Sequence, residues 1–265
     1  MSMRRVLIIG GGFGPEVNRM KRSVAGLVLS LACAALAVLS GCRAKEAPNT
    51  GFTTSDLMDH DPTLPFHKVW LKPGFDYRDY RKLYVADVNT DYMLKQTDWQ
   101  KGERKAQIER DVKELAVYAR RSIEKAFRED PKHLYQVLDA PTTDPDALVF
   151  ELAITQIVPS KVVLNVLEYA PFWIGTGISA VRAVGGDQSS AAFEARLRVA
   201  STHEIVAMSA DREVQQFAPV SVRGLTWYSH AKAILDLWSK KFVEVANRKP
   251  GERVKAIDTF TLKPW

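Results

Sequence analysis

The chain has 265 residues and a formal net charge of +6, but that charge is unevenly distributed. The first 41 residues carry five basic residues and one acidic residue, so the remaining 224 carry 32 basic and 30 acidic residues. Because nucleic-acid binding needs a clustered basic face, this nearly neutral body gives no argument for a nucleic-acid partner. A body of 224 residues is long enough to bury the core of one domain.

The first element in the chain, an apolar run from Val6 followed by glycines, matches half of a dinucleotide-binding fingerprint. Gly10 and Gly12 take the first two glycine positions, but Pro15 stands at the third. The stretch about 20 residues on, where a carboxylate would hold the ribose, contains none. We therefore predict no dinucleotide cofactor and interpret residues 1–19 as a spurious upstream extension.

Residues 20–41 have the layout of a secretory signal peptide. Lys21 and Arg22 form a basic start, and the apolar run that follows is shorter than the roughly 20 residues of a comfortable membrane span. The run ends in Leu39, Ser40, Gly41 and Cys42, which resemble the lipobox of bacterial lipoproteins. In that family the peptide before the cysteine is removed and the cysteine is acylated. An uncleaved anchor, with Cys42 as an ordinary small residue, is the alternative.

Lipidation at Cys42 would give the protein a membrane as its partner through three acyl chains, where stable anchoring needs at least two. The other cysteine, Cys33, lies in the leader, so neither a disulfide nor a cysteine-ligated zinc site is predicted. Arg43 stands where an Asp often retains bacterial lipoproteins in the inner membrane. The expected location is therefore the bacterial cell envelope, on the outer membrane's inner leaflet and facing the periplasm.

The predicted body begins with a polar, proline-containing tether at 42–64 that starts to dock near Phe52 and Leu57, followed by a single domain at 65–265. A β-rich run at 80–88 predicts a strand. Residues 99–129 predict a long amphipathic helix, because apolar residues recur along one stripe. These residues are Ile108, Val112, Leu115, Ala119, Ile123 and Phe127.

Further strands are predicted at 133–138 and 145–159, followed by a hairpin that turns at Ser201, Thr202 and His203. In the first hairpin strand Phe193 and alternate residues face inward, while Glu194, Arg196 and Arg198 face outward. A final helix is predicted at 229–247, and a last strand at 256–262. This order predicts an α+β fold, an α/β sandwich. It has a mixed, largely antiparallel sheet with a long N-terminal helix and a C-terminal helix packed on it.

Several of these stretches, behind a lipobox, resemble the bacterial lipoproteins of domain of unknown function 3313. They are Gly51-Phe52, the strand at 80–88, the hairpin "FEARLRVASTHEIVAMSADRE" and Leu237-Trp238 in the last helix. The resemblance covers about residues 51–247. The chain has Asp87-Val88-Asn89 where members tend to have Asp-Pro-Val, and His203 where they tend to have Gly. The resemblance implies an envelope lipoprotein and supplies no catalytic residues.

No local motif of catalysis or metal binding is found, so we predict no catalytic residue, metal or cofactor. The dense polar cluster at Asp59, His60 and Asp61 is a turn or helix cap, or alternatively a metal site. Ser189 and Ser190 are expected in a loop before a strand.

The most apolar stretch of the body, 162–186, is a core helix broken at Pro171, or alternatively an exposed partner patch around Phe172, Trp173 and Ile174. The predicted role is a non-enzymatic accessory or scaffold domain that contacts envelope proteins. A module for a small apolar ligand or lipid, and a hydrolase with a dispersed site, are the alternatives.

Overall fold

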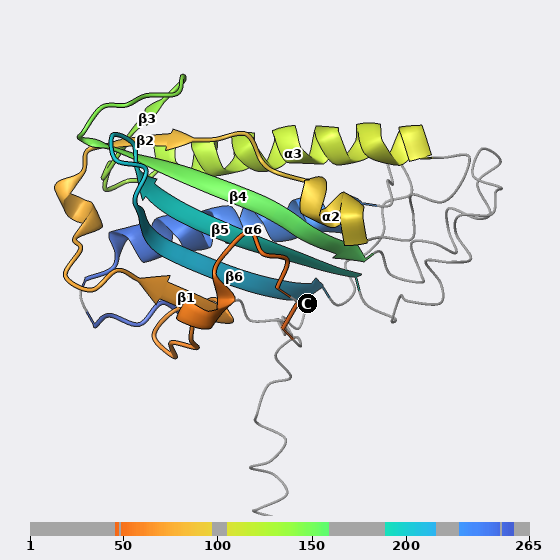
Figure 1. Ribbon diagram of the computed structural model, residues 1–265, viewed down its shortest axis with the longest axis horizontal. Coiled ribbons are helices and arrows are strands. Elements are labelled where there is room, and N and C mark those ends of the chain that lie inside the picture. Colours follow the sequence, from red (N-terminus) through yellow and green to blue (C-terminus); the bar gives the residue numbers. More distant parts are fainter. Residues whose placement is uncertain are drawn as a thin grey trace, which may run out of the picture. The chain divides into compact units, whose positions relative to one another are not determined.

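The computed structural model describes residues 46–47, 49–96, 105–158, 189–215, 228–249 and 251–256. Residues 44–265 cluster as one compact unit, and every core residue within the described part lies between Phe52 and Val254. The structure has a six-stranded sheet in the order β1-β6-β5-β4-β2-β3, with helices packed on one face (Figure 1). The α+β prediction is confirmed.

The strands are β1 (Lys68–Leu71), β2 (Lys82–Val85), β3 (Gln136–Leu138), β4 (Ala147–Val158), β5 (Ser189–Val199) and β6 (Ile205–Gln215). The pairs β1–β6, β6–β5 and β5–β4 are antiparallel, whereas β4–β2 and β2–β3 are parallel. The sheet is therefore mixed and largely antiparallel, as predicted. The turn of the β5–β6 hairpin contains His203, whose φ of 61° lies in the left-handed region.

Two long helices, α3 (Lys105–Arg128) and α6 (Ser229–Asn247), pack against each other and cover one face of the sheet. The predicted stripe of α3 is confirmed, because Val112, Leu115, Ala119, Ile123 and Phe127 are buried. The long helix is not N-terminal in the domain, however. It follows β1, β2 and the short helix α2 (Asp91–Gln96), and with β2 and β3 it forms a parallel crossover. Short 3-10 turns occupy Ser55–Leu57 and Tyr77–Asp79.

The core lies between the sheet and the two helices. Phe193 of β5 is at its centre, 4.6 Å from the ring of Trp238 and 5.2 Å from the ring of Phe242, both on α6. Phe150 of β4 packs edge-on against Phe242 at 4.8 Å. These contacts attach α6 to the two central strands, because aromatic pairs in this geometry stabilise beyond their buried area.

The segment from residue 49 to 64 is part of the folded domain, which corrects the predicted tether boundary. Phe52, Met58 and Leu64 are buried, whereas Leu57 remains 52% exposed. The backbone of Asp59 pairs with that of Val69, a residue of β1. The segment crosses the sheet face opposite α6, seen as the orange trace in front of β5 and β6 (Figure 1). Docking therefore begins at about residue 50, close to the predicted start near Phe52, and residues 50–64 belong to the domain instead of to a tether.

Candidate functional site

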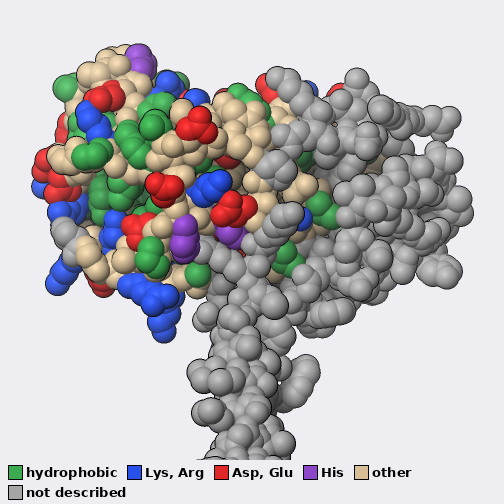
Figure 2. Space-filling view, turned by 60° about the horizontal axis from the view of Figure 1, so that its bottom comes forward, with side chains coloured by type: hydrophobic (Ala, Val, Ile, Leu, Met, Phe, Trp, Pro, Cys, Tyr) green, Lys and Arg blue, Asp and Glu red, His purple; other side chains and the backbone are tan. Residues whose placement is uncertain are grey.

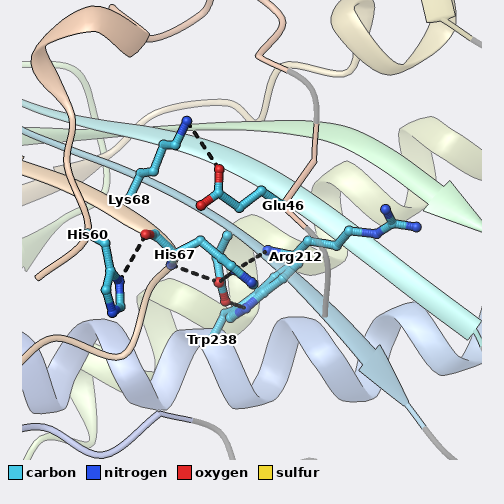
Figure 3. A network of polar contacts seen from close by, with 7 residues as sticks. Glu46, His60, His67, Lys68, Arg212 and Trp238 are labelled. Atoms are coloured by element: carbon cyan, nitrogen blue, oxygen red, sulfur yellow. Dashed lines mark hydrogen bonds and ion pairs between the residues drawn. The ribbon is translucent and has the colours of Figure 1, made fainter. Parts of the chain in front are cut away.

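A buried carboxylate, Asp211 of β6, links three parts of the fold (Figure 3). Its Oδ2 accepts a hydrogen bond from Trp238 Nε1 of α6 at 3.0 Å. Its Oδ1 accepts from the backbone N–H of His67, just before β1, at 3.1 Å, and also contacts His67 Nδ1. Both side chains are almost fully buried, so these contacts lie in an environment where electrostatic attraction is strong.

A histidine oriented by a carboxylate is one element of a hydrolytic site, which also needs a nucleophile within hydrogen-bond reach. Ser190 of β5 does not supply it from the same side. Phe193 pairs with Asp211, and alternation along the strand places Ser190 on the opposite face. The hydroxyl of Ser190 accepts a hydrogen bond from Arg212 at 3.3 Å. Ser189 and Ser190 begin β5, which corrects their expected place in a loop.

A small cavity of about 30 Å³, with both polar and apolar groups in its wall, adjoins His67 and Asp211 where the N-terminal segment passes over the sheet edge. Glu46 contributes to its wall and forms an ion pair with Lys68 of β1 at 3.2 Å. A single water needs roughly 10–15 Å³ of such space, so the cavity has room for about two waters. We infer that the Asp211 contacts hold β1, β6 and α6 together.

The N-terminal segment is held by a second buried carboxylate, Glu194 of β5, which is 2% exposed. It accepts hydrogen bonds from the backbone N–H of Thr50 at 2.6 Å, from that of Thr53 at 2.8 Å and from Thr53 Oγ1 at 2.9 Å. We call these three contacts the Glu194 clamp. Glu194 lies on the face away from Phe193, as alternation predicts, but it is buried there because the N-terminal segment covers this face of the sheet.

Arg196, two residues along β5, supports the same segment. Its guanidinium lies 4.0 Å from the centre of the Phe52 ring, and its Nη1 donates to the Phe52 carbonyl at 3.1 Å. Its Nε donates to Glu151 of β4 at 2.9 Å, so the charge is paired as well. Phe52 also makes an edge-on contact with the ring of Tyr92 on α2, at 5.6 Å between ring centres.

An apolar pocket of about 100 Å³ opens at the other side of the sheet, between β1, β6 and the C-terminal end of α6. Its wall includes Leu64, Phe66, Leu71, Phe150, Phe242 and Ala246. Leu71 is 38% exposed and so contacts both solvent and pocket. On the described surface seen in Figure 2, hydrophobic side chains, charged side chains and histidines are mixed, and neither sign of charge dominates.

Two tyrosines in the pocket wall have their hydroxyls occupied by backbone oxygens. Tyr135 donates to the carbonyl of Tyr77 at 3.0 Å, and Tyr77 donates to the carbonyls of Val245 and Arg248 at 3.4 Å. Burial raises the pKa of both phenols. The tyrosines therefore present neutral aromatic rings to the pocket at physiological pH.

The profile of DUF3313, a protein family of unknown function, matches residues 48–242. The chain belongs to this family. No curated protein matches the DUF3313 chain at a significant level.

Two solved structures of the PelC dodecamer from Paraburkholderia phytofirmans, one a point variant, resemble the fold distantly. The variant has a TM-score of 0.36 and 8% identity, and the match covers 68% of this chain and 97% of that chain. The other has a TM-score of 0.34 and 8% identity, with coverage of 65% and 94%. Similarity at this level carries no functional argument.

The residues predicted to carry function lie outside the described part of the DUF3313 chain. This holds for Leu39, Ser40, Gly41 and Cys42, and for the patch at 172–174. Within the described residues, no group of three His, Cys, Asp or Glu side chains could hold a metal, and no helix is long and apolar enough to cross a membrane. Asp61 accepts from the backbone and hydroxyl of Thr63, which makes its cluster a turn.

Sequence reasoning missed the roles of His67, Asp211 and Glu194. The signal that could have found the two acids is their position inside apolar strands. Glu194 follows "AAF" in β5, and Asp211 lies in the middle of β6. When both faces of a strand are covered by other parts of the protein, a carboxylate on that strand must be hydrogen-bonded. The alternation of apolar residues in the sequence does not show whether the second face is covered.

Proposed function

We propose that this DUF3313 protein is a lipid-anchored lipoprotein of the bacterial cell envelope. The observation that carries the proposal is the sequence Leu39-Ser40-Gly41-Cys42 at the end of a short apolar run. Thr50, the first residue bound by the Glu194 clamp, comes eight positions after Cys42. A fully extended chain spans at most about 3.5 Å per residue, so the anchor would hold the domain within roughly 28 Å of the acylated cysteine.

Metabolic labelling with palmitate tests the anchor. We expect label on the wild-type protein and none on Cys42→Ala, because only a thiol at that position can be acylated in the proposed way. Cys33→Ala is the matched control and should keep the label, since this cysteine lies in the leader that is removed. A mature protein that starts upstream of Cys42 and carries no added hydrocarbon mass would disprove the proposal.

The outer membrane, on its periplasmic leaflet, is the proposed destination, because Arg43 instead of Asp follows the acylated cysteine. Separation of inner and outer membranes on a density gradient should place the wild type in the outer-membrane fraction. Arg43→Asp should move a substantial part to the inner membrane. Inner-membrane location of the wild type would contradict this part of the proposal.

For the anchored domain we propose a non-enzymatic accessory or scaffold role in an envelope assembly. Support comes from the buried carboxylates, whose described hydrogen bonds hold structural elements together. The proposed partner patch is Phe172, Trp173 and Ile174. A photo-reactive amino acid at Trp173 should cross-link to an envelope protein, whereas the same group at the exposed Val117 of α3 should not. Cross-linking only between copies of the chain would count against a hetero-partner.

A module for a small apolar ligand is the second candidate, and the apolar pocket between sheet and α6 favours it. Its volume of about 100 Å³ is about two-thirds of that of an engineered 150 Å³ cavity known to bind benzene. Binding of a neutral apolar probe to the domain, measured by calorimetry, tests this candidate. A domain that binds no such probe would leave the scaffold role alone.

A further inference from the structure

The apolar pocket and the chain that follows α6 together indicate a class of ligand. We propose that the pocket binds the hydrocarbon tail of a medium-chain fatty acid, whose carboxylate contacts the basic segment at 248–255. This inference rests on the second candidate function, ligand binding, and is independent of acylation at Cys42.

The pocket favours hydrocarbon because of its wall. Leu64, Phe66 and Phe242 supply apolar surface, and the tyrosine hydroxyls in the wall already donate to backbone carbonyls. A polar ligand group placed here would lose water without gaining a partner, at a cost that a methylene does not incur. Each methylene that enters instead gains roughly 0.8 kcal/mol. The volume of about 100 Å³ suits the end of a chain and is too small for a long lipid.

The basic segment lies next to this pocket. Val245 and Ala246 line the pocket, and Arg248 and Lys249 follow them after one residue, Asn247. Further along, the backbone N–H of Val254 donates to the carbonyl of Thr63 at 2.8 Å, which places the segment beside Leu64 in the pocket wall. The segment therefore approaches the pocket from α6 and again from the Leu64 side.

The charge of this segment favours an anion. Residues 248–255 contain Arg248, Lys249, Arg253 and Lys255 against the single acid Glu252. Glu252 accepts a hydrogen bond from the backbone N–H of Lys249 at 2.9 Å. Burial raises the pKa of Asp61, but hydrogen bonds from Thr63 and the charge of the nearby Arg248 outweigh it and lower the pKa, so the Asp61 carboxylate offsets part of the basic charge. The excess of basic over acidic side chains remains, so an anionic head group is attracted and a cationic one repelled.

Calorimetric titration of residues 44–265 with matched eight-carbon probes tests the proposal, since this unit contains the whole described core. We expect octanoate to bind about threefold more tightly than octanol, as an exposed ion pair contributes little more than this. Octylamine should bind more weakly than octanol. The advantage of octanoate should shrink at high salt, because exposed charges are screened.

Variants separate the tail contact from the head contact. Ala246→Phe fills the pocket and should weaken octanoate binding by about tenfold, whereas Leu237→Phe, at an exposed position of the same helix, should not. The double substitution Arg248→Gln and Lys249→Gln should make octanoate and octanol equal.

Equal binding of octanoate and octanol to the wild type would overturn the fatty-acid inference but leave a ligand module standing. Absence of binding for both probes would overturn the inference and the ligand module together. Unchanged binding in a folded Ala246→Phe variant, with folding checked by circular dichroism, would show that the tail binds elsewhere and would also overturn the inference.

Discussion

Replacing Glu194 tests how the N-terminal segment is attached to the domain. The carboxylate is 2% exposed and accepts three hydrogen bonds from Thr50 and Thr53. Glu194→Gln keeps the shape and one carbonyl oxygen, but it removes the charge and turns an N–H donor toward one of the three donors. Glu194→Ala removes both acceptor oxygens, so the backbone N–H groups of Thr50 and Thr53 and the Thr53 hydroxyl lose their acceptor.

The expected magnitude follows from these contacts. Hydrogen bonds to a charged group contribute about 1.5–3 kcal/mol each, while removal of the charge regains part of its dehydration cost. We expect a loss of about 1.5 kcal/mol of unfolding free energy for Glu194→Gln and about 3 kcal/mol for Glu194→Ala. Detachment of the segment would also expose Phe52 and Met58, at roughly 1.5–3 kcal/mol each. The segment should therefore stay docked in Glu194→Gln but open about ten times more often.

Two measurements on residues 44–265 check this reasoning. Urea unfolding gives the free-energy loss, and hydrogen exchange of the amide of Thr53 should be about tenfold faster in Glu194→Gln, as 1.4 kcal/mol of local stability corresponds to that factor. The matched control is Glu204→Gln, because Glu204 forms an exposed pair with Lys72 and should cost under about 0.5 kcal/mol. Unchanged exchange at Thr53 with a folded variant would refute the role of the clamp.

Three further substitutions give defined outcomes. His203→Gly should raise the unfolding free energy by about 0.5 kcal/mol in urea titrations, because φ at this turn is positive and glycine adopts it without strain. Asp211→Ala should lower it by about 3 kcal/mol and weaken the packing of Trp238, seen as altered tryptophan fluorescence. Burial, and donation to Asp236, raise the pKa of Tyr118 from 10.0 to about 12. The neutral phenol therefore stabilises the fold below pH 10, and this stabilisation is lost as pH rises from 10 through about 12. Tyr118→Phe should reduce this alkaline loss, and a loss equal to that of the wild type would contradict the cause given.

Sequence patterns predicted the long helices and strands, in which apolar residues recur regularly over many positions. The helix at 229–247 was predicted with the bounds that α6 has, and α3 lies inside the predicted 99–129. β4, β5 and β6 follow alternating patterns of apolar residues. Such patterns are informative because one face of each element packs on the core over many residues.

Short elements were missed for the opposite reason. β1 has four residues and its place in the sheet depends on pairing with β6, and α2 has six residues. Both elements are too short to show a hydrophobic periodicity that stands out from the surrounding sequence. The start of docking near Phe52 was predicted, but the attachment of the whole stretch 49–64 to the sheet was not, because it depends on a carboxylate more than 140 positions away, Glu194 in β5.

The clamp connects the fold to the proposed anchoring. With Thr50 bound, eight residue steps separate the docked chain from Cys42, a reach of at most roughly 28 Å. Release of the segment as far as Leu64 would extend the chain after Cys42 to 22 residue steps, or at most roughly 77 Å. The hydrogen bonds of Glu194, together with the burial of Phe52 and Met58, would thus keep an anchored domain near its own membrane, and loss of these contacts would let it reach farther. A scaffold that must meet partners at a fixed height needs the first state, which is the state the Glu194 clamp stabilises.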